Sequence, residues 1–87
     1  MSAETQIEAL GLVLPPAMVV PPGVSLPFAF INVVGSRAII SGHLPQGEDG
    51  AIAPPFGKVG AEVDEAAAYA AARQVGLSIL GGLQREL

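Results

Sequence analysis

The residues with the most evident chemical potential are Ser41, Gly42 and His43, which follow one another directly. A serine close to a histidine invites comparison with a nucleophile and its general base. Residues two apart on a strand lie along the same face, and no acid follows in an arrangement that would orient the imidazole. The sequence therefore does not favour a serine hydrolase. Two interpretations stay open: Ser41 ends a strand while His43 caps a loop, or both residues line a ligand pocket.

The acidic residues do not have the spacing of a metal site. Five of the eight lie close together in the second half of the chain: Glu48, Asp49, Glu62, Asp64 and Glu65. None belongs to a calcium-binding type of loop, the chain has no cysteine, and His43 is its one histidine. We interpret these carboxylates as solvated charge and expect neither a metal nor a cofactor.

The basic residues do not form a site for phosphate or nucleic acid. The tetrapeptide Gly57-Lys58-Val59-Gly60 lacks the leading glycine and the following hydroxyl residue of a phosphate loop, so Lys58 is a surface charge or a contact at a subunit edge. Arg73 is either an exposed helix charge or a buried anchor for a neighbouring chain. The net charge of -4 repels a phosphate backbone, and we expect no nucleic-acid partner.

Composition favours a small protein that associates with copies of itself. The 87 residues make at most one small domain, which is 51% hydrophobic and 14% charged and must leave apolar area uncovered. An uncharged run over residues 9–36 contains five prolines, which argues against a membrane helix. Glu4 and Glu8 stand where a secretory signal needs basic residues. We expect a soluble, cytoplasmic homo-oligomer that does not enter the membrane.

The first third of the chain is predicted to wrap around the rest. Residues 1–11 form a short helix that Ser2 caps and Gly11 ends. Residues 12–27 are rich in proline, which excludes helix and central strand, so they form a strap over the surface. Apolar anchors hold this strap: Leu12, Leu14 and Val20.

Residues 28–42 are predicted to form a β-hairpin. Two segments rich in β-branched and aromatic residues, 28–34 and 37–41, flank Gly35-Ser36, which suits a two-residue turn of type II′ or a related type. Pairing across this turn places Val34 opposite Arg37 and gives one strongly apolar face. That face is expected to need a helix over it, and consists of Ile31, Val33, Ala38 and Ile40.

The last half is predicted to be a loop followed by the covering helix. Residues 43–63 are rich in turns and hold a short strand at 51–53, and residues 64–87 form a helix capped by Asp64. Gly76 is expected to allow close approach to the strands, whereas Gly81-Gly82 weakens the last turns. Spacing predicts a packed face made of Tyr69, Ala72, Gly76, Ile79, Leu80, Leu83 and Leu87.

The order of several short motifs resembles the first half of a RidA-type protein, of the family also called YjgF or endoribonuclease L-PSP. These motifs are LGLVLPP at 10–16, Gly35, Ser41-Gly42, Leu44-Pro45, Gly57-Lys58-Val59-Gly60 and Ala71-Ala72-Arg73. The resemblance implies an α+β fold, with a mixed sheet backed by two helices and assembly as a trimer with clefts between subunits. We therefore expect the N-terminal half of a RidA-like fold, a hairpin and a short strand packed on one long helix, in a single partial domain over residues 1–87.

The same resemblance implies a function. Members of one branch hydrolyse reactive 2-imino acids to 2-keto acids and ammonia without cofactor or metal. Pocket-lining roles carry over to Phe28, which stands where that branch often has a tyrosine, to Ser41 and Gly42, and to His43, which stands where glutamine is common. The arginine and glutamate credited with the chemistry belong to the family's second half, so no catalytic residue is assigned here.

Two functional hypotheses follow. The first is a small-molecule enzyme that hydrolyses imine or enamine metabolites and is incomplete in this truncated chain. The alternative is a non-catalytic oligomeric module for ligand binding or interaction. The ribonuclease activity in one family name conflicts with the acidic balance and the absence of a basic patch with aromatics. We expect this chain to release no more than background ammonia from an imine.

Overall fold

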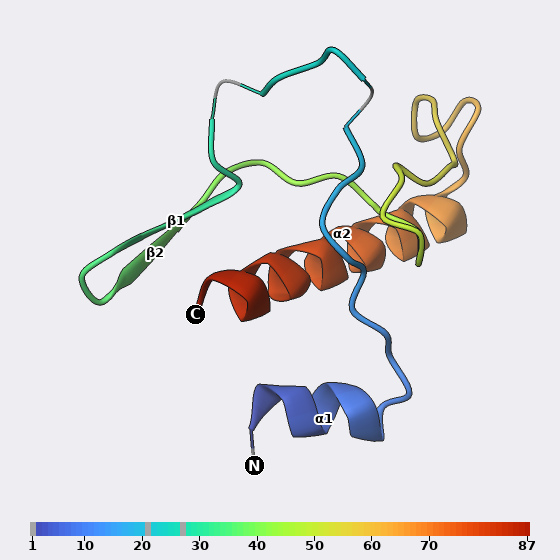
Figure 1. The fold of residues 1–87 in the computed structure, drawn as a ribbon. Coiled ribbons are helices and arrows are strands. Elements are labelled where there is room, and N and C mark those ends of the chain that lie inside the picture. Colours follow the sequence, from blue (N-terminus) through green and yellow to red (C-terminus); the bar gives the residue numbers. More distant parts are fainter. Residues whose placement is uncertain (1, 21, 27) are drawn as a thin grey trace.

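The computed structural model describes residues 2–20, 22–26 and 28–87 (Figure 1). Its elements are α1 (Ala3–Ala9), β1 (Ile31–Val34), β2 (Arg37–Ile40) and α2 (Glu65–Glu86). The chain is a small α+β protein, in which an antiparallel two-stranded hairpin packs against the long C-terminal helix. None of the helices in the described segments has both the length and the apolar character that crossing a bilayer requires. Pro21 and Pro27, two prolines of the predicted strap, lie outside the described residues.

Both helices begin where the sequence predicts. The Ser2 Oγ accepts a hydrogen bond from the Thr5 N–H at 3.2 Å, and the Asp64 Oδ1 accepts one from the Ala67 N–H at 2.8 Å. Each cap satisfies a backbone donor that the first helical turn leaves without a partner. After α1 the chain turns away at Gly11, whose φ of +71° is one that a glycine adopts without strain.

The hairpin register is also the predicted one. Val34 pairs with Arg37 and Asn32 pairs with Ile39, with Gly35 at a φ of +60° in the turn. The strands are shorter than predicted, because β1 begins at Ile31 and β2 ends at Ile40. One further ladder bond extends the pairing, from the Ser41 N–H to the Phe30 carbonyl oxygen at 2.9 Å.

The predicted strand at 51–53 is wrong. Ile52 forms a single antiparallel bridge with Gln46, and a second isolated bridge joins Val59 to Val63. Pro54 and Pro55 follow directly, and a proline has no N–H with which to continue a ladder. The segment between the hairpin and α2 is therefore a loop that is fixed at two points.

The predicted packed face of α2 is also wrong. The buried residues are Leu77, Ser78, Gly81 and Gly82, whereas Tyr69 is 78% and Leu80 39% exposed. Large apolar side chains occur around much of this helix, so their spacing does not mark the side that packs. Small residues mark the packed side instead, because they let the rest of the chain approach the helix backbone. Gly76, expected at the close approach, has open space where a Cβ would be.

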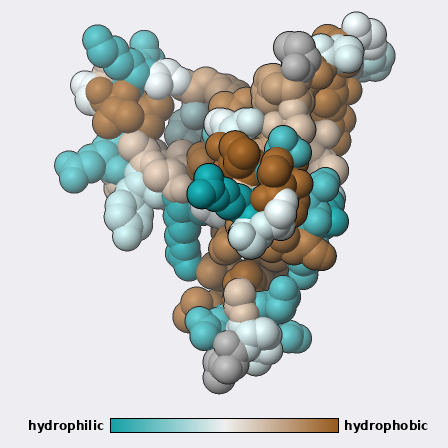
Figure 2. Space-filling model, turned by 90° about the vertical axis from the view of Figure 1, so that its left-hand side faces the viewer, coloured by the Kyte–Doolittle hydropathy of each residue, from teal (hydrophilic) through white to brown (hydrophobic). Residues whose placement is uncertain are grey.

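Only one end of the hairpin is covered, which corrects the expectation of a helix over its whole apolar face. Ile31 is buried against α2, but Val33 and Ile40 are exposed, and the hairpin projects past the end of the helix (Figure 1). Seen from the hairpin side, hydrophobic atoms lie openly on the surface (Figure 2). The Cα radius of gyration is 14.2 Å, against about 12 Å for a compact chain of this length.

The packing of α2 leads to a prediction for Leu77, which is 8% exposed. Leu77→Ala should lower the free energy of unfolding by about 2 to 4 kcal/mol, because it leaves a cavity beneath the helix. Leu80→Ala, three residues along the same helix, should cost less than half as much. Urea unfolding followed by circular dichroism measures both values. Equal losses would contradict the assignment of the buried face.

Candidate functional site

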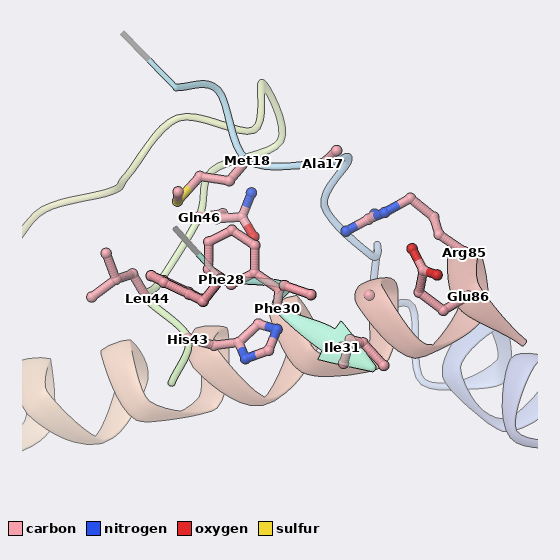
Figure 3. Close-up of a pocket in the computed structure, with 12 residues that line it drawn as sticks. Ala17, Met18, Phe28, Phe30, Ile31, His43, Leu44, Gln46, Arg85 and Glu86 are labelled. Carbon is pink, nitrogen blue, oxygen red and sulfur yellow. The ribbon is translucent and has the colours of Figure 1, made fainter. Parts of the chain in front are cut away.

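A cavity of about 300 Å³ lies where the strap, the start of the hairpin and the end of α2 meet (Figure 3). Four segments of the chain contribute to it, because the loop that follows the hairpin also supplies lining residues. Most of the wall is apolar; the charged side chains, Arg85 and Glu86, come from α2, and His43 comes from the loop. Its lining residues are Ala17, Met18, Phe28, Ala29, Phe30, Ile31, His43, Leu44, Gln46, Gly82, Arg85 and Glu86.

Three aromatic rings form a row along one wall. The Phe28 and Phe30 ring centroids are 5.3 Å apart in an edge-to-face arrangement with an interplanar angle of 74°. The His43 ring follows at 5.3 Å from Phe30, tilted by 52°. Offset and edge-to-face geometries are those that aromatic pairs prefer. This wall suits the apolar part of a small ligand.

The hydrogen bonding of His43 fixes its tautomer when the ring is neutral. Its Nδ1 lies 2.7 Å from the Ser41 carbonyl oxygen. A carbonyl oxygen can only accept, so Nδ1 carries the proton and donates it. The Nε2 atom is then left with a lone pair, and it lies beside α2, 3.6 Å from the place where a Cβ on Gly82 would be. In this state Nε2 can accept a hydrogen bond from a ligand or a water molecule.

The four residues with predicted pocket roles do not all meet. Phe28 and His43 line this cavity, but Ser41 and Gly42 are not among its lining residues. The Ser41 Oγ instead donates to the Ala29 carbonyl oxygen at 2.8 Å, which ties the end of the hairpin to its start. No nucleophile and base are therefore paired by Ser41 and His43.

The sequence analysis missed Arg85 and Glu86, which supply the charges of this cavity. Arg85 lies in the last turns of α2, which Gly81-Gly82 was expected to weaken, but its Nη1 donates to the Pro15 carbonyl oxygen at 3.1 Å and so joins the helix to the strap. One signal was available. Arg85 lies four residues after Gly81, so both are on the same helix face, which is the face that approaches the strap.

Gln46 is a second residue that the sequence analysis missed. It is 4% exposed, and its Nε2 donates to the carbonyl oxygens of Pro16 and Gly50, each at 3.0 Å. The main-chain carbonyl oxygen of Gln46 accepts from the Gln74 Nε2 at 2.6 Å. Through its side chain and its backbone, this one buried residue thus connects the strap, the loop and α2, and it holds the cavity walls in place.

The tetrapeptide Gly57-Lys58-Val59-Gly60 forms a turn, apart from this cavity. The Lys58 N–H donates to the Glu62 Oε2 at 2.9 Å, and this bond is the main reason that the pKa of the Glu62 carboxyl is lowered. A Cβ on Gly57 would lie 2.7 Å from the Glu62 Cβ, so that position requires a glycine. In this chain the role of the tetrapeptide is therefore to allow the backbone conformation of the turn.

Other parts of the surface bring together fewer groups that could bind a ligand or take part in a reaction. A wider cavity of about 580 Å³ lies between α2 and the loop, but it is lined mostly by alanine, proline and glycine, with Glu48 as its ionisable residue. Within the described residues, no three potential metal ligands gather closely enough to hold an ion. Arg73 is exposed, and its role as an anchor for a neighbouring chain stays a prediction.

Comparisons of the chain with protein-family models, curated proteins and solved structures found no match. The resemblance to RidA-type proteins therefore stays a hypothesis.

The contact between the strap and α2 leads to a prediction for a matched pair of glycines. Gly76→Ala should raise the free energy of unfolding by about 1 kcal/mol, because alanine favours helix and nothing lies within 4 Å of the new Cβ. Gly81→Ala brings the same gain in propensity, but its Cβ would lie 2.9 Å from the Pro15 carbonyl oxygen.

Gly81→Ala should therefore destabilise the protein by about 1 to 3 kcal/mol. Thermal unfolding of the two variants beside the parent measures the difference. If both variants are stabilised alike, the strap does not lie against α2 at this point.

Proposed function

We propose that this chain is a RidA-like half-fold that binds a small, amino-acid-like metabolite, of the 2-imino acid class, in the cavity beside Arg85. The proposal includes the finer assignment of the fold as the N-terminal half of a RidA-like domain. Support comes from the order of motifs along the chain and from the chemistry of the cavity.

The observation that carries the proposal is the pair of opposite charges next to an aromatic wall. A 2-imino acid has a carboxylate and, when protonated, a positively charged nitrogen on the adjacent carbon. The Arg85 guanidinium suits the carboxylate, since it donates from several N–H groups in one plane. The Glu86 carboxylate suits the charged nitrogen, and the rings of Phe28 and Phe30 suit a short apolar side chain (Figure 3).

The same cavity, which His43 also lines, provides a route to imine hydrolysis. Water adds to the carbon of the C=N bond, and the resulting tetrahedral intermediate expels ammonia to leave a 2-keto acid. The His43 Nε2 lone pair is available to take a proton from the attacking water and return it to the leaving nitrogen. No cofactor or metal enters this sequence of steps.

The open character of the cavity favours binding over catalysis. Arg85 and Glu86 are both exposed, and one Arg85 nitrogen already donates to Pro15. Charged groups in contact with water hold a substrate less firmly, and a wet site gains little from electrostatic stabilisation. We therefore favour a ligand-binding module whose hydrolytic step is incomplete. Self-association of the chain belongs to the proposal as well.

The binding site is tested with L-2-aminobutyrate, a stable compound that carries a carboxylate and a charged nitrogen. Titration followed by amide chemical shifts should place the largest changes at residues of the cavity. Arg85→Ala should weaken binding at least about tenfold, because it removes the carboxylate partner. Arg73→Ala is the matched control on an exposed part of the same helix and should bind as the parent does. Equal affinities of the two variants would contradict the site.

The hydrolytic step is tested by generating 2-aminoacrylate with a dehydratase in the presence of the chain. We expect ammonia release at the background rate, since free imines already hydrolyse quickly in water and a wet site adds little. Acceleration that His43→Ala abolishes, with the circular dichroism spectrum unchanged, would show instead that the chain is a complete hydrolase.

A further inference from the structure

The outer edge of β2 is exposed along its whole length. All four residues of the strand are exposed, and Ile39 and Ile40 have 55% and 44% of their surface in contact with solvent. Within the described segments the sheet has two strands, so β2 pairs with β1 on one side only. An unpaired strand of this kind presents N–H and C=O groups to which another strand can bind.

The phase of the ladder identifies which backbone groups point outward. The Ser41 N–H donates to Phe30, so Ser41 faces β1. Orientation alternates along an antiparallel strand, and Ile39 therefore also faces β1, while the N–H and C=O groups of Ala38 and Ile40 point away from it. These outward groups form a short, regular edge with no proline in it.

The accessible area of the chain argues for a partner of considerable size. The chain exposes 6189 Å², whereas a compact monomer of 8.8 kDa exposes roughly 4,800 Å². The surplus of about 1,400 Å² exceeds the approximately 800 Å² that each partner buries in a stable interface of standard size. One interface of ordinary size on the exposed face is enough to remove most of this surplus.

We infer that this edge binds a second copy of the same chain, with the two β2 strands antiparallel across a two-fold axis at Ile39. Ala38 of each copy then exchanges backbone hydrogen bonds with Ile40 of the other. The result is a four-stranded sheet in the order β1-β2-β2-β1, with both α2 helices on one face. This contact does not depend on the ligand proposed above.

The charges and side chains of the strand fit this arrangement. The one charged residue of β2 is Arg37, at its start, so the two copies place their arginines at opposite ends of the interface. The two Arg37 residues are then four residues apart, or about 13 Å along the strands, which avoids repulsion between their like charges. The two Ile39 side chains meet at the axis and cover one another, and the exposed Ile40 and Val33 side chains extend one apolar face.

Proline substitutions test the edge without breaking the hairpin. Ala38→Pro removes an N–H that points outward from β2, and Val33→Pro removes the equivalent outward N–H of β1. Sedimentation equilibrium across the micromolar range should find the parent and Val33→Pro as dimers. Ala38→Pro should raise the dimer dissociation constant at least about tenfold. A monomeric or trimeric parent, or equal behaviour of the two variants, would overturn the inference.

Cross-linking tests the register directly, because the chain has no cysteine of its own. Directly opposed residues at such a position have Cα atoms about 4.5 Å apart, which is within the range of a disulfide. Ile39→Cys should therefore give a covalent dimer on mild oxidation, as seen on a non-reducing gel. Val34→Cys, equally exposed but on β1, should give at least about tenfold less cross-linked product. Similar yields from both variants would rule out this register.

Discussion

The arrangement of the whole chain depends on how closely other segments approach the backbone of α2 at Gly81 and Gly82. The strap lies against Gly81 through the Pro15 carbonyl oxygen, and β1 lies against Gly82 through Ile31. Any larger residue at either position would push its neighbour away. Two adjacent glycines, which cost helix stability in isolation, thus provide the surface on which the strap and the hairpin are placed.

This contact also determines the cavity. With the strap and the start of the hairpin both seated on the last turns of α2, the His43 ring, Arg85 and Glu86 are brought to one place. Gln46 then fixes the loop to the strap and to the helix through hydrogen bonds to both. A few polar contacts between segments therefore organise a site in a chain whose buried hydrophobic residues, within the described segments, are only Ile31, Val63 and Leu77.

The same packing leaves the hairpin largely uncovered. The glycine contact holds β1 at Ile31, so Val33, Ile39 and Ile40 extend beyond the helix into solvent. A chain of this size cannot cover both the strap side and the hairpin side of its helix. The site and the exposed sheet edge are thus two consequences of one limitation: there is more apolar surface than the chain can enclose. The ligand binding proposed at one end of the hairpin and the association proposed along β2 are therefore compatible.

The sequence by itself determined the local structure. Ser2 and Asp64 start helices because a side-chain oxygen binds an N–H three residues on, and Gly35 makes the hairpin turn because it adopts a positive φ without strain. The tertiary structure alone decided the packed face of α2 and the meeting of His43 with Arg85 and Glu86. Both depend on which distant segments pack against the helix. The spacing of large apolar residues did not indicate the packed face of α2, because small residues made the contact.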